Sequence, residues 1–328
     1  MDTPTLPPPD FGPKRGNDAA WERKTLEKLA FASLAEQKTR RRWGIFFKLL
    51  GFAYLTVVLA LAFDWGDTEK LADGRHTALV QLKGVIDSSG EASADKINSA
   101  LRSAFEDKGT AGVILRINSP GGSPVQSGII NDEIRRLRGK YPDIPLYVVV
   151  EDVCASGGYY VAAAADKIFV DKASLVGSIG VLMDGFGFTG TMDKLGVERR
   201  LLTAGENKGF LDPFSPQDPK QKLMAQTMLG EIHKQFIDVV KKGRGQRLKE
   251  TPDMFSGLVW TGARSIELGL ADDFGTVSSV ARDVIKAEKV MDYTQKENIA
   301  ERFAKRFGAD MVQGAVKALG QASQPQAR

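Results

Sequence analysis

Residues 146–162 read LYVVVEDVCASGGYYVA, and this stretch decides how the rest of the chain is interpreted. Its first part, 146–150, is rich in β-branched residues and is typical of a short buried strand, whereas the small residues of 159–165 favour a helix. Ser156 therefore falls at a strand-to-helix turn, where free N–H groups and the positive end of the helix dipole gather. Two interpretations stay open at this point: Ser156 caps the helix, or its hydroxyl is a nucleophile.

A second turn with glycines precedes the first one in the chain. Residues 111–118 are typical of another buried strand, and 119–124 read SPGGSP before a predicted helix at 125–138. In a parallel sheet both turns lie at the carboxyl ends of the strands, where such sheets hold their sites. The backbone N–H groups of Gly122 and Gly157 would then form an oxyanion hole, although two ordinary strand-helix connections would give the same pattern.

A hydroxyl nucleophile needs a base, and histidine is the usual one. The chain has two histidines, His76 and His233, and neither accompanies a glycine turn, so a Ser-His-Asp triad is not expected. The other candidate is a lysine that burial keeps neutral. Lys208 fits this description because it follows a predicted strand at 198–202 and precedes the apolar turn at 209–211. A solvated surface lysine is the alternative interpretation.

Six short blocks of sequence, taken in order, resemble the short form of the bacterial signal peptide peptidase A family. The blocks are SPGG at 119–122, ASGGYY at 155–160, VGSIGV at 176–181, AGENK at 204–208, VWTG at 259–262 and GLAD at 269–272. The resemblance covers about residues 77–286. It implies a serine peptidase on an α/β core like that of crotonases and Clp proteases, with a parallel sheet and crossover helices.

The resemblance also implies a role for each of five residues. Ser156 would be the nucleophile, Lys208 the general base, and Ser178 the hydroxyl that orients the lysine. Gly122 and Gly157 would donate the two N–H groups of the oxyanion hole. Homo-oligomers are implied too, in which neighbouring copies contribute the base and the nucleophile of one site. No metal and no other cofactor is implied.

Composition limits the possible partners and chemistry. With 328 residues, 42% hydrophobic and 26% charged, the chain has room for one large or two ordinary domains. The net charge of +4 is spread along the sequence, so no nucleic-acid partner is indicated. Cys154 is the single cysteine and forms no internal disulfide; we expect it to pack as a small buried hydrophobe rather than to act as a thiol nucleophile.

An apolar run near the N-terminus predicts a membrane anchor. Residues 43–63 are apolar apart from Lys48, and about 20 residues of helix cross the hydrocarbon core of a bilayer. Arginines at 40–42 precede the run and acidic residues follow it, so the positive-inside rule predicts a cytoplasmic N-terminus and a periplasmic remainder at a bacterial inner membrane. A cleaved signal peptide is the main alternative, but its basic region would be unusually long. A buried core helix would not be so uniformly apolar.

These observations divide the chain into five parts. They are a cytoplasmic tail at 1–42, a transmembrane anchor at 43–63, a linker at 64–76, a periplasmic peptidase domain at 77–290, and an amphipathic C-terminal helix with a tail at 291–328. Strands alternate with helices in the peptidase domain, which predicts a parallel sheet with crossover helices. A further helix, predicted at 216–242, carries an apolar stripe that is typical of core or subunit contacts.

The sequence thus predicts a membrane-anchored serine endopeptidase that cuts short apolar peptides, such as signal peptide remnants, through an acyl-enzyme. Two other functions stay open. A crotonase-like enzyme that acts on acyl thioesters would share the oxyanion hole but needs no Ser-Lys pair. A membrane-tethered scaffold would retain the fold without chemistry. Covalent labelling of Ser156 by a serine-directed phosphonate distinguishes the peptidase from both.

Overall fold

The structure is a computed structural model that describes residues 18–62 and 74–295. The chain divides into two compact units, and the larger one is Lys70–Lys296. Each unit is described by itself. Most of the predicted linker at 64–76, and the predicted C-terminal helix beyond residue 295, lie outside the described residues.

The first unit contributes one long helix, α1 (Asp18–Ala62). It is continuous because this stretch contains no proline. Its segment 43–57 exposes a row of large apolar side chains, among them Trp43, Phe46 and Phe47. Within the described part of the chain, the structure has no helix whose length and apolar character would let it span a membrane. The predicted transmembrane helix at 43–63 is therefore not supported, and its last residue lies outside the described part.

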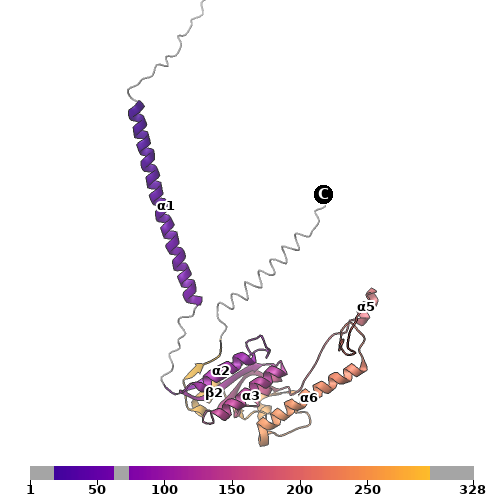
Figure 1. Ribbon diagram of the computed structural model, residues 1–328. Coiled ribbons are helices and arrows are strands. Elements are labelled where there is room, and N and C mark those ends of the chain that lie inside the picture. The colour runs from indigo at the N-terminus through magenta and orange to yellow at the C-terminus, as the bar shows by residue number, and fades with distance from the viewer. Residues whose placement is uncertain (1–17, 63–73, 296–328) are drawn as a thin grey trace, which may run out of the picture. The chain divides into compact units, whose positions relative to one another are not determined.

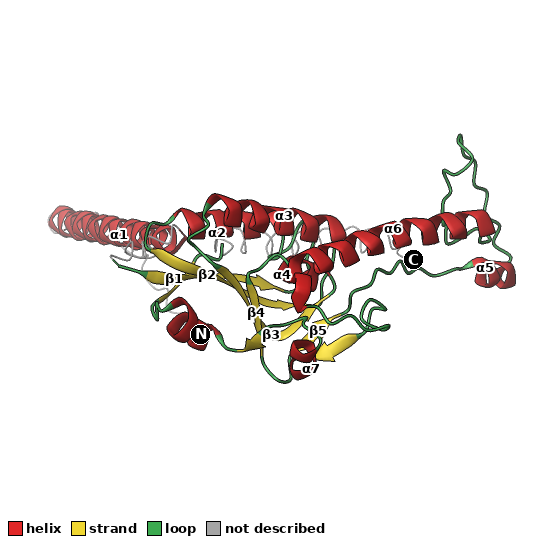
Figure 2. Cartoon of the chain, turned by 90° about the horizontal axis from the view of Figure 1, so that it is seen from below, coloured by secondary structure: helices red, strands yellow, loops and turns green. Residues whose placement is uncertain are grey.

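An eight-stranded sheet forms the centre of the second unit (Figure 2). The strands are β1 (His76–Lys83), β2 (Thr110–Ser119), β3 (Leu146–Ala155), β4 (Lys167–Val170), β5 (Leu175–Gly177), β6 (Val259–Thr261), β7 (Asp273–Phe274) and β8 (Val290–Asp292). Their order is β6-β5-β3-β2-β1-β8, while β4 pairs with β3 and β7. Only the β5–β6 pair is antiparallel among these strands.

Helices connect the parallel strands. They are α2 (Ala94–Glu106), α3 (Pro124–Lys140), α4 (Gly157–Ala162), α5 (Thr189–Leu195), α6 (Pro219–Arg244), α7 (Gly262–Glu267) and α8 (Val277–Ser279), with a 3-10 turn at Gly245–Arg247 and a π-helical turn at Val280–Ile285. Helices α2 and α3 are crossovers between neighbouring parallel strands, because β1, β2 and β3 follow one another in the sheet. The predicted α/β class with a mostly parallel sheet is confirmed.

The sheet is buried on both faces, as parallel sheets usually are. Successive residues of a strand point to opposite faces, so Val80 and Leu82 join one core while Leu79 joins the other. The larger core includes apolar residues of α2, α3, α4 and α6, which cover one face (Figure 2). The smaller core includes Val280 and Ile285 of the π-helical turn.

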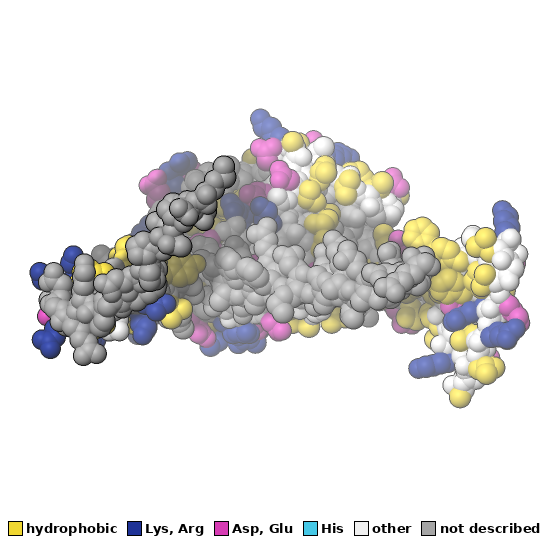
Figure 3. Space-filling view, turned by 90° about the horizontal axis from the view of Figure 1, so that it is seen from above, with side chains coloured by type: hydrophobic (Ala, Val, Ile, Leu, Met, Phe, Trp, Pro, Cys, Tyr) yellow, Lys and Arg dark blue, Asp and Glu magenta, His cyan; other side chains and the backbone are white. Residues whose placement is uncertain are grey.

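An arm, residues 183–231, leaves the sheet after β5 and returns through the first half of α6 (Figure 1). Residues 198–202 have no regular structure here, so the predicted strand is wrong: within residues 18–62 and 74–295, no strand pairs with them. The helix predicted at 216–242 begins later, at Pro219, because Asp218 caps it through the N–H of Lys220 at 2.8 Å. Much of the arm surface is apolar (Figure 3).

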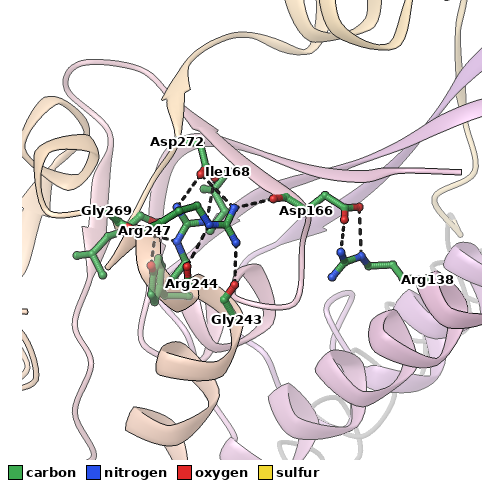
Figure 4. A network of polar contacts seen from close by, with 10 residues as sticks. Arg138, Asp166, Ile168, Gly243, Arg244, Arg247, Gly269 and Asp272 are labelled. Carbon is green, nitrogen blue, oxygen red and sulfur yellow. Dashed lines mark hydrogen bonds and ion pairs between the residues drawn. The ribbon is translucent and has the colours of Figure 1, made fainter. Parts of the chain in front are cut away.

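A charged network fixes the C-terminal end of α6 to the sheet (Figure 4). The guanidinium of Arg244 is fully buried and donates two 2.9 Å hydrogen bonds to the carboxylate of Asp272. The same carboxylate accepts the N–H of Ile168 at 2.7 Å and a hydrogen bond from Arg247 at 3.1 Å. Burial alone would raise the pKa of Asp272, but the hydrogen bonds and charge of Arg244 outweigh it, so this pKa lies below its ordinary value.

This network predicts a pH-dependent contribution to stability. Asp272→Asn leaves Arg244 buried without a counter-charge, which we expect to lower the free energy of unfolding at neutral pH by about 3–5 kcal/mol. Because the pKa of Asp272 is lowered by folding, its contribution is present above the ordinary value of 3.8 and is lost as pH falls through the folded value. Urea unfolding of both proteins from pH 7 to pH 2.5 measures the difference.

The exposed neighbour Asp273 supplies the control, since Asp273→Asn changes the same charge outside the network. We expect that control to follow the wild-type protein at every pH. If the difference in the free energy of unfolding between wild type and Asp272→Asn stayed constant down to the lowest pH, Asp272 would not be the source of the pH dependence.

Candidate active site

Ser156 stands in a strained backbone conformation between β3 and α4. Its φ of 50° and ψ of −123° place it in a region that residues other than glycine rarely occupy. The chain holds it there by a 2.8 Å hydrogen bond from its N–H to Gly177 and by a 2.9 Å bond from Tyr160 to its carbonyl. Its side chain makes no capping hydrogen bond to α4, so the capping interpretation is wrong. The hydroxyl is thus left available for chemistry.

The glycine turn after β2 packs directly against Ser156. A Cβ at Gly121 would lie 2.7 Å from the Cβ of Ser156, and a Cβ at Gly122 would lie 2.1 Å from the carbonyl oxygen of Ile86. Both glycines also have positive φ, at 103° and 150°. Only glycine therefore fits at these positions, since a side chain would collide with backbone on either side.

The two predicted oxyanion donors face the same region. A Cβ at Gly157 would lie 3.2 Å from the backbone nitrogen of Gly122, so the two turns come within contact distance. Within the described residues, neither of these two N–H groups donates a hydrogen bond to the protein. Two unpaired N–H groups beside a serine hydroxyl are the arrangement that an oxyanion hole requires.

Ser156, Gly157, Gly122 and Ser178 together line a pocket of about 570 Å³. Its other lining residues are Pro120, Pro124, Ser127, Tyr160, Gly180, Val181, Leu182, Ile232, Gln235, Phe236, Ser256 and Gly257. Tyr160 and Phe236 form one wall, with ring centroids 5.1 Å apart. Burial raises the pKa of the Tyr160 phenol, which keeps this wall uncharged. The pocket is of a size and character that suit an apolar side chain.

Ser178 reaches the pocket because β5 pairs in parallel with the end of β3. The register sets Gly177 opposite Ala155, one residue before Ser156. Ser178 has a φ of 51°, so it too adopts the left-handed conformation, and its N–H donates to Leu258 at 2.7 Å. The side chain that the resemblance assigns to orienting the base thus lies at the same pocket as the predicted nucleophile.

Lys208 is not among the residues that line this pocket. It lies on the arm, in a run of turns in which its N–H donates to Gly205 at 3.1 Å, and it is exposed. One copy of the chain therefore brings together four of the five predicted site residues and leaves the predicted base in solvent.

The structure also locates the residues that were considered and set aside. Cys154 is completely buried, and burial raises the pKa of its thiol, so it packs as a small hydrophobe as predicted. His76 begins β1, at the opposite end of this strand from the glycine turns. The position of His233 was not expected from the sequence: its Nε2 lies 3.1 Å from the carbonyl oxygen of Ile179, the residue after Ser178. Its position in a long amphipathic helix gave no signal of this contact.

No cluster of three or more His, Cys, Asp or Glu side chains suited to a metal ion occurs in the described part of the chain.

The sequence is similar to a known peptidase family and to several named proteins. Residues 139–291 match the model of Peptidase family S49. The chain is 44% identical over 209 residues to the Na(+)/H(+) antiporter NhaA of Brucella melitensis, a match that covers 62% of this chain and 28% of that protein. It is 31% identical over 241 residues to Protease 4 of Haemophilus influenzae, covering 72% of this chain and 38% of that protein. It is 30% identical over 249 residues to "Probable protease SohB" of the same organism, covering 74% and 69%.

The close packing of the two turns predicts a specific pair of mutational effects. In Gly157→Ala the new methyl group would lie 2.4 Å from the hydroxyl oxygen of Ser127, so we expect a loss of about 1–3 kcal/mol in the free energy of unfolding. Ser127→Ala added to Gly157→Ala removes that oxygen and should restore most of the lost stability. Urea unfolding measures both variants, and mass spectrometry after fluorophosphonate treatment measures the labelling rate of Ser156.

Gly128→Ala is the matched control, because Gly128 lies on the same helix as Ser127 and has open space around it. Alanine there should leave labelling unchanged and stabilise the helix slightly. The described packing is refuted if Gly157→Ala is neutral, or if removing the Ser127 hydroxyl rescues nothing.

Proposed function

The chain belongs to peptidase family S49, and from this membership we propose that it is a serine peptidase in which Ser156 attacks the peptide bond and Lys208 is the base. The observation that carries the proposal is the strained, uncapped Ser156 beside two unpaired backbone N–H groups at an apolar pocket. Together these features offer a nucleophile, donors for the negative oxygen of the intermediate and room for a substrate side chain, which acyl transfer to a serine hydroxyl uses.

The proposed reaction has two halves. The neutral amine of Lys208 takes the proton of Ser156 while the serine oxygen bonds to the peptide carbonyl carbon. The N–H groups of Gly122 and Gly157 stabilise the negative oxygen that forms. Lys208 then gives the proton to the leaving amine, and the C–N bond breaks to leave an ester on Ser156. A water molecule, deprotonated by the same lysine, then attacks the ester carbon. The bond between that carbon and the serine oxygen breaks, Lys208 returns the proton to Ser156, and the peptide acid leaves.

We propose that Lys208 reaches Ser156 from a neighbouring copy of the chain. The support is that Lys208 lies on a projecting arm and outside the pocket of its own copy. The arm also exposes large apolar side chains, such as Phe186, Leu202 and Leu223, at 80%, 96% and 66% of their surface. Apolar area of this kind favours contact with another protein surface. Contact between copies would also exclude water from the lysine, which a neutral amine requires.

Complementation between two inactive variants tests this proposal. We expect Ser156→Ala and Lys208→Ala each to lower kcat at least about a thousandfold, because each removes a group that bonds or transfers the proton. When the two variants are expressed together and assemble with each other, the mixed oligomers should regain measurable turnover. Some of their sites then combine an intact Ser156 with an intact Lys208. The readout is hydrolysis of a fluorogenic apolar peptide.

Lys194→Ala is the control, because Lys194 is another exposed lysine of the arm. It should retain normal turnover. Full activity in Lys208→Ala would remove the lysine from the mechanism, and a mixture that stays inactive while both variants co-assemble would mean that nucleophile and base must come from one copy.

The pocket supports short apolar peptides as substrates. Tyr160, Phe236, Ile232 and Leu182 offer apolar surface next to Ser156 and no charged side chain lines the pocket among the described residues. Burying an apolar substrate side chain there would contribute about 1.5–3 kcal/mol. Signal peptide remnants, which are rich in such side chains, are the substrates that we propose.

We further propose that the segment 43–57 of α1 attaches the protein to a bacterial inner membrane, with the peptidase unit in the periplasm. The exposed side chains of Phe46, Phe47 and Leu50 and the arginines at 40–42 support attachment to an anionic lipid surface. The periplasmic location of the peptidase unit is predicted from the sequence, because arginines precede the apolar run at 43–63 and acidic residues follow it.

Vesicle flotation tests the attachment. Phe46→Ser combined with Phe47→Ser should reduce the fraction bound to vesicles of zwitterionic and anionic phospholipid about tenfold or more, because two large apolar side chains are lost from the contact. As the control, Leu26→Ser combined with Phe31→Ser removes two apolar side chains that are more exposed than Phe46 and Phe47 and lie on the other half of the same helix. Equal losses in the two double variants would disprove attachment through the segment 43–57.

A further inference from the structure

We propose that His233 is a positioning residue for the reaction: its imidazole fixes the turn that carries Ser178, although it touches neither the substrate nor Ser156. The inference rests on the proposed function, because it assigns His233 to the serine that orients the lysine base. It adds a residue that the sequence analysis considered only as a triad member and set aside.

The turn at Ser178 is strained and needs support. Gly177 and Ser178 follow each other with φ values of 113° and 51°, an unusual pair at the end of a strand. The N–H of Ser178 is held by Leu258 at 2.7 Å, and the N–H of Gly180 turns back to the carbonyl of Ser178 at 2.9 Å. Between them, the side chain of Ile179 is completely buried. Among the described residues, no backbone N–H donates a hydrogen bond to the carbonyl oxygen of this buried residue, so its partner must be a side chain.

His233 supplies the partner of that carbonyl group. Its Nε2 lies 3.1 Å from the oxygen, and within the described residues this is the single hydrogen bond between α6 and the segment 175–182. Removing it would leave a buried acceptor unpaired, which costs more than the hydrogen bond itself contributes. The contact therefore couples the orientation of Ser178 to the position of α6.

The same helix face also forms part of the pocket. His233 is half-buried and lies one helical turn before Phe236, while Ile232 and Gln235 beside it line the pocket directly. This hydrogen bond links the pocket wall on α6 to the Ser178 turn after β5. A shift of about 1 Å in a positioning group can change a catalytic rate about a hundredfold.

The chemistry of the contact excludes a role for Nε2 as the base. A carbonyl oxygen only accepts hydrogen bonds, so Nε2 must carry the proton and has no lone pair to offer to Ser156. Proton transfer stays with the lysine, and the imidazole acts through the backbone. An amide NH₂ at the same place would serve equally well, which a proton-transferring histidine would not allow.

Three variants test the inference in the full-length protein. His233→Leu keeps a side chain of similar size but has no donor, and we expect kcat to fall about tenfold with KM changed less than about twofold. In His233→Gln the amide nitrogen replaces Nε2 as the donor, and kcat should return to within about threefold of wild type. Val240→Ala removes packing from a buried position of the same helix and should leave kcat unchanged at equal fraction folded.

Hydrogen exchange followed by mass spectrometry gives a readout that does not depend on activity. The amides of Ser178 and Gly180 are hydrogen-bonded in the turn, so a peptide covering 175–182 reports on its opening. We expect faster exchange of this peptide in His233→Leu, wild-type exchange in His233→Gln, and no change in Val240→Ala.

The outcomes separate this inference from the proposed function. Unchanged kcat and unchanged exchange in His233→Leu would overturn it while leaving the peptidase proposal intact. Loss of activity in His233→Gln as deep as in His233→Leu would also overturn it, because a donor would then not suffice. If the wild-type protein neither cuts peptides nor takes up a phosphonate, the proposed function fails and the catalytic role of His233 fails with it, while the exchange data still decide whether His233 holds the turn.

Discussion

The left-handed backbone at Ser156 is the constraint on which the rest of the site depends. A serine in this conformation costs on the order of 1–3 kcal/mol, so surrounding contacts must hold it. The parallel pairing of β3 with β5 holds one side through the carbonyl of Gly177, and the first turn of α4 holds the other. Glycines at 121 and 122 then allow a second backbone to approach where any side chain would collide. The strain aims the hydroxyl away from helix capping and toward the pocket.

Helix α6 contributes to three parts of the molecule: the arm, the pocket and the buried charged network. Its first half belongs to the arm, its middle forms part of the pocket wall, and its end is fixed by the buried Arg244 and Asp272. A buried ion pair of this kind favours one position for the helix, because moving α6 would leave the charges of Arg244 and Asp272 buried without each other. Displacing the arm would therefore act on the pocket through a rigid element rather than through a loop.

If the nucleophile and the base come from different copies, the function of the arm is to carry Lys208 to the pocket of a neighbouring copy. Within one copy the hydroxyl, the oxyanion donors and Ser178 line one pocket, while Lys208 lies outside that pocket and is exposed. Under this proposal, an isolated subunit would be unable to cut peptides. The apolar surface of the arm supports the same interpretation.

The sequence by itself determined the α/β class and the two glycine turns with Gly122, Ser156 and Gly157, because strand periodicity and turn chemistry are local properties. Ser178 was added to this group only by the resemblance to a known family. The prediction of a strand at 198–202 was wrong, because in the described part of the chain these residues pair with no other strand. Only the tertiary structure decided that Ser156 is uncapped, that Lys208 lies outside the pocket of its own copy, and that His233 meets Ile179. The first depends on the pairing of β3 with β5, and the other two depend on where the arm and α6 lie. A contact such as that of His233 with Ile179, which are 54 residues apart, leaves no periodic trace in the sequence.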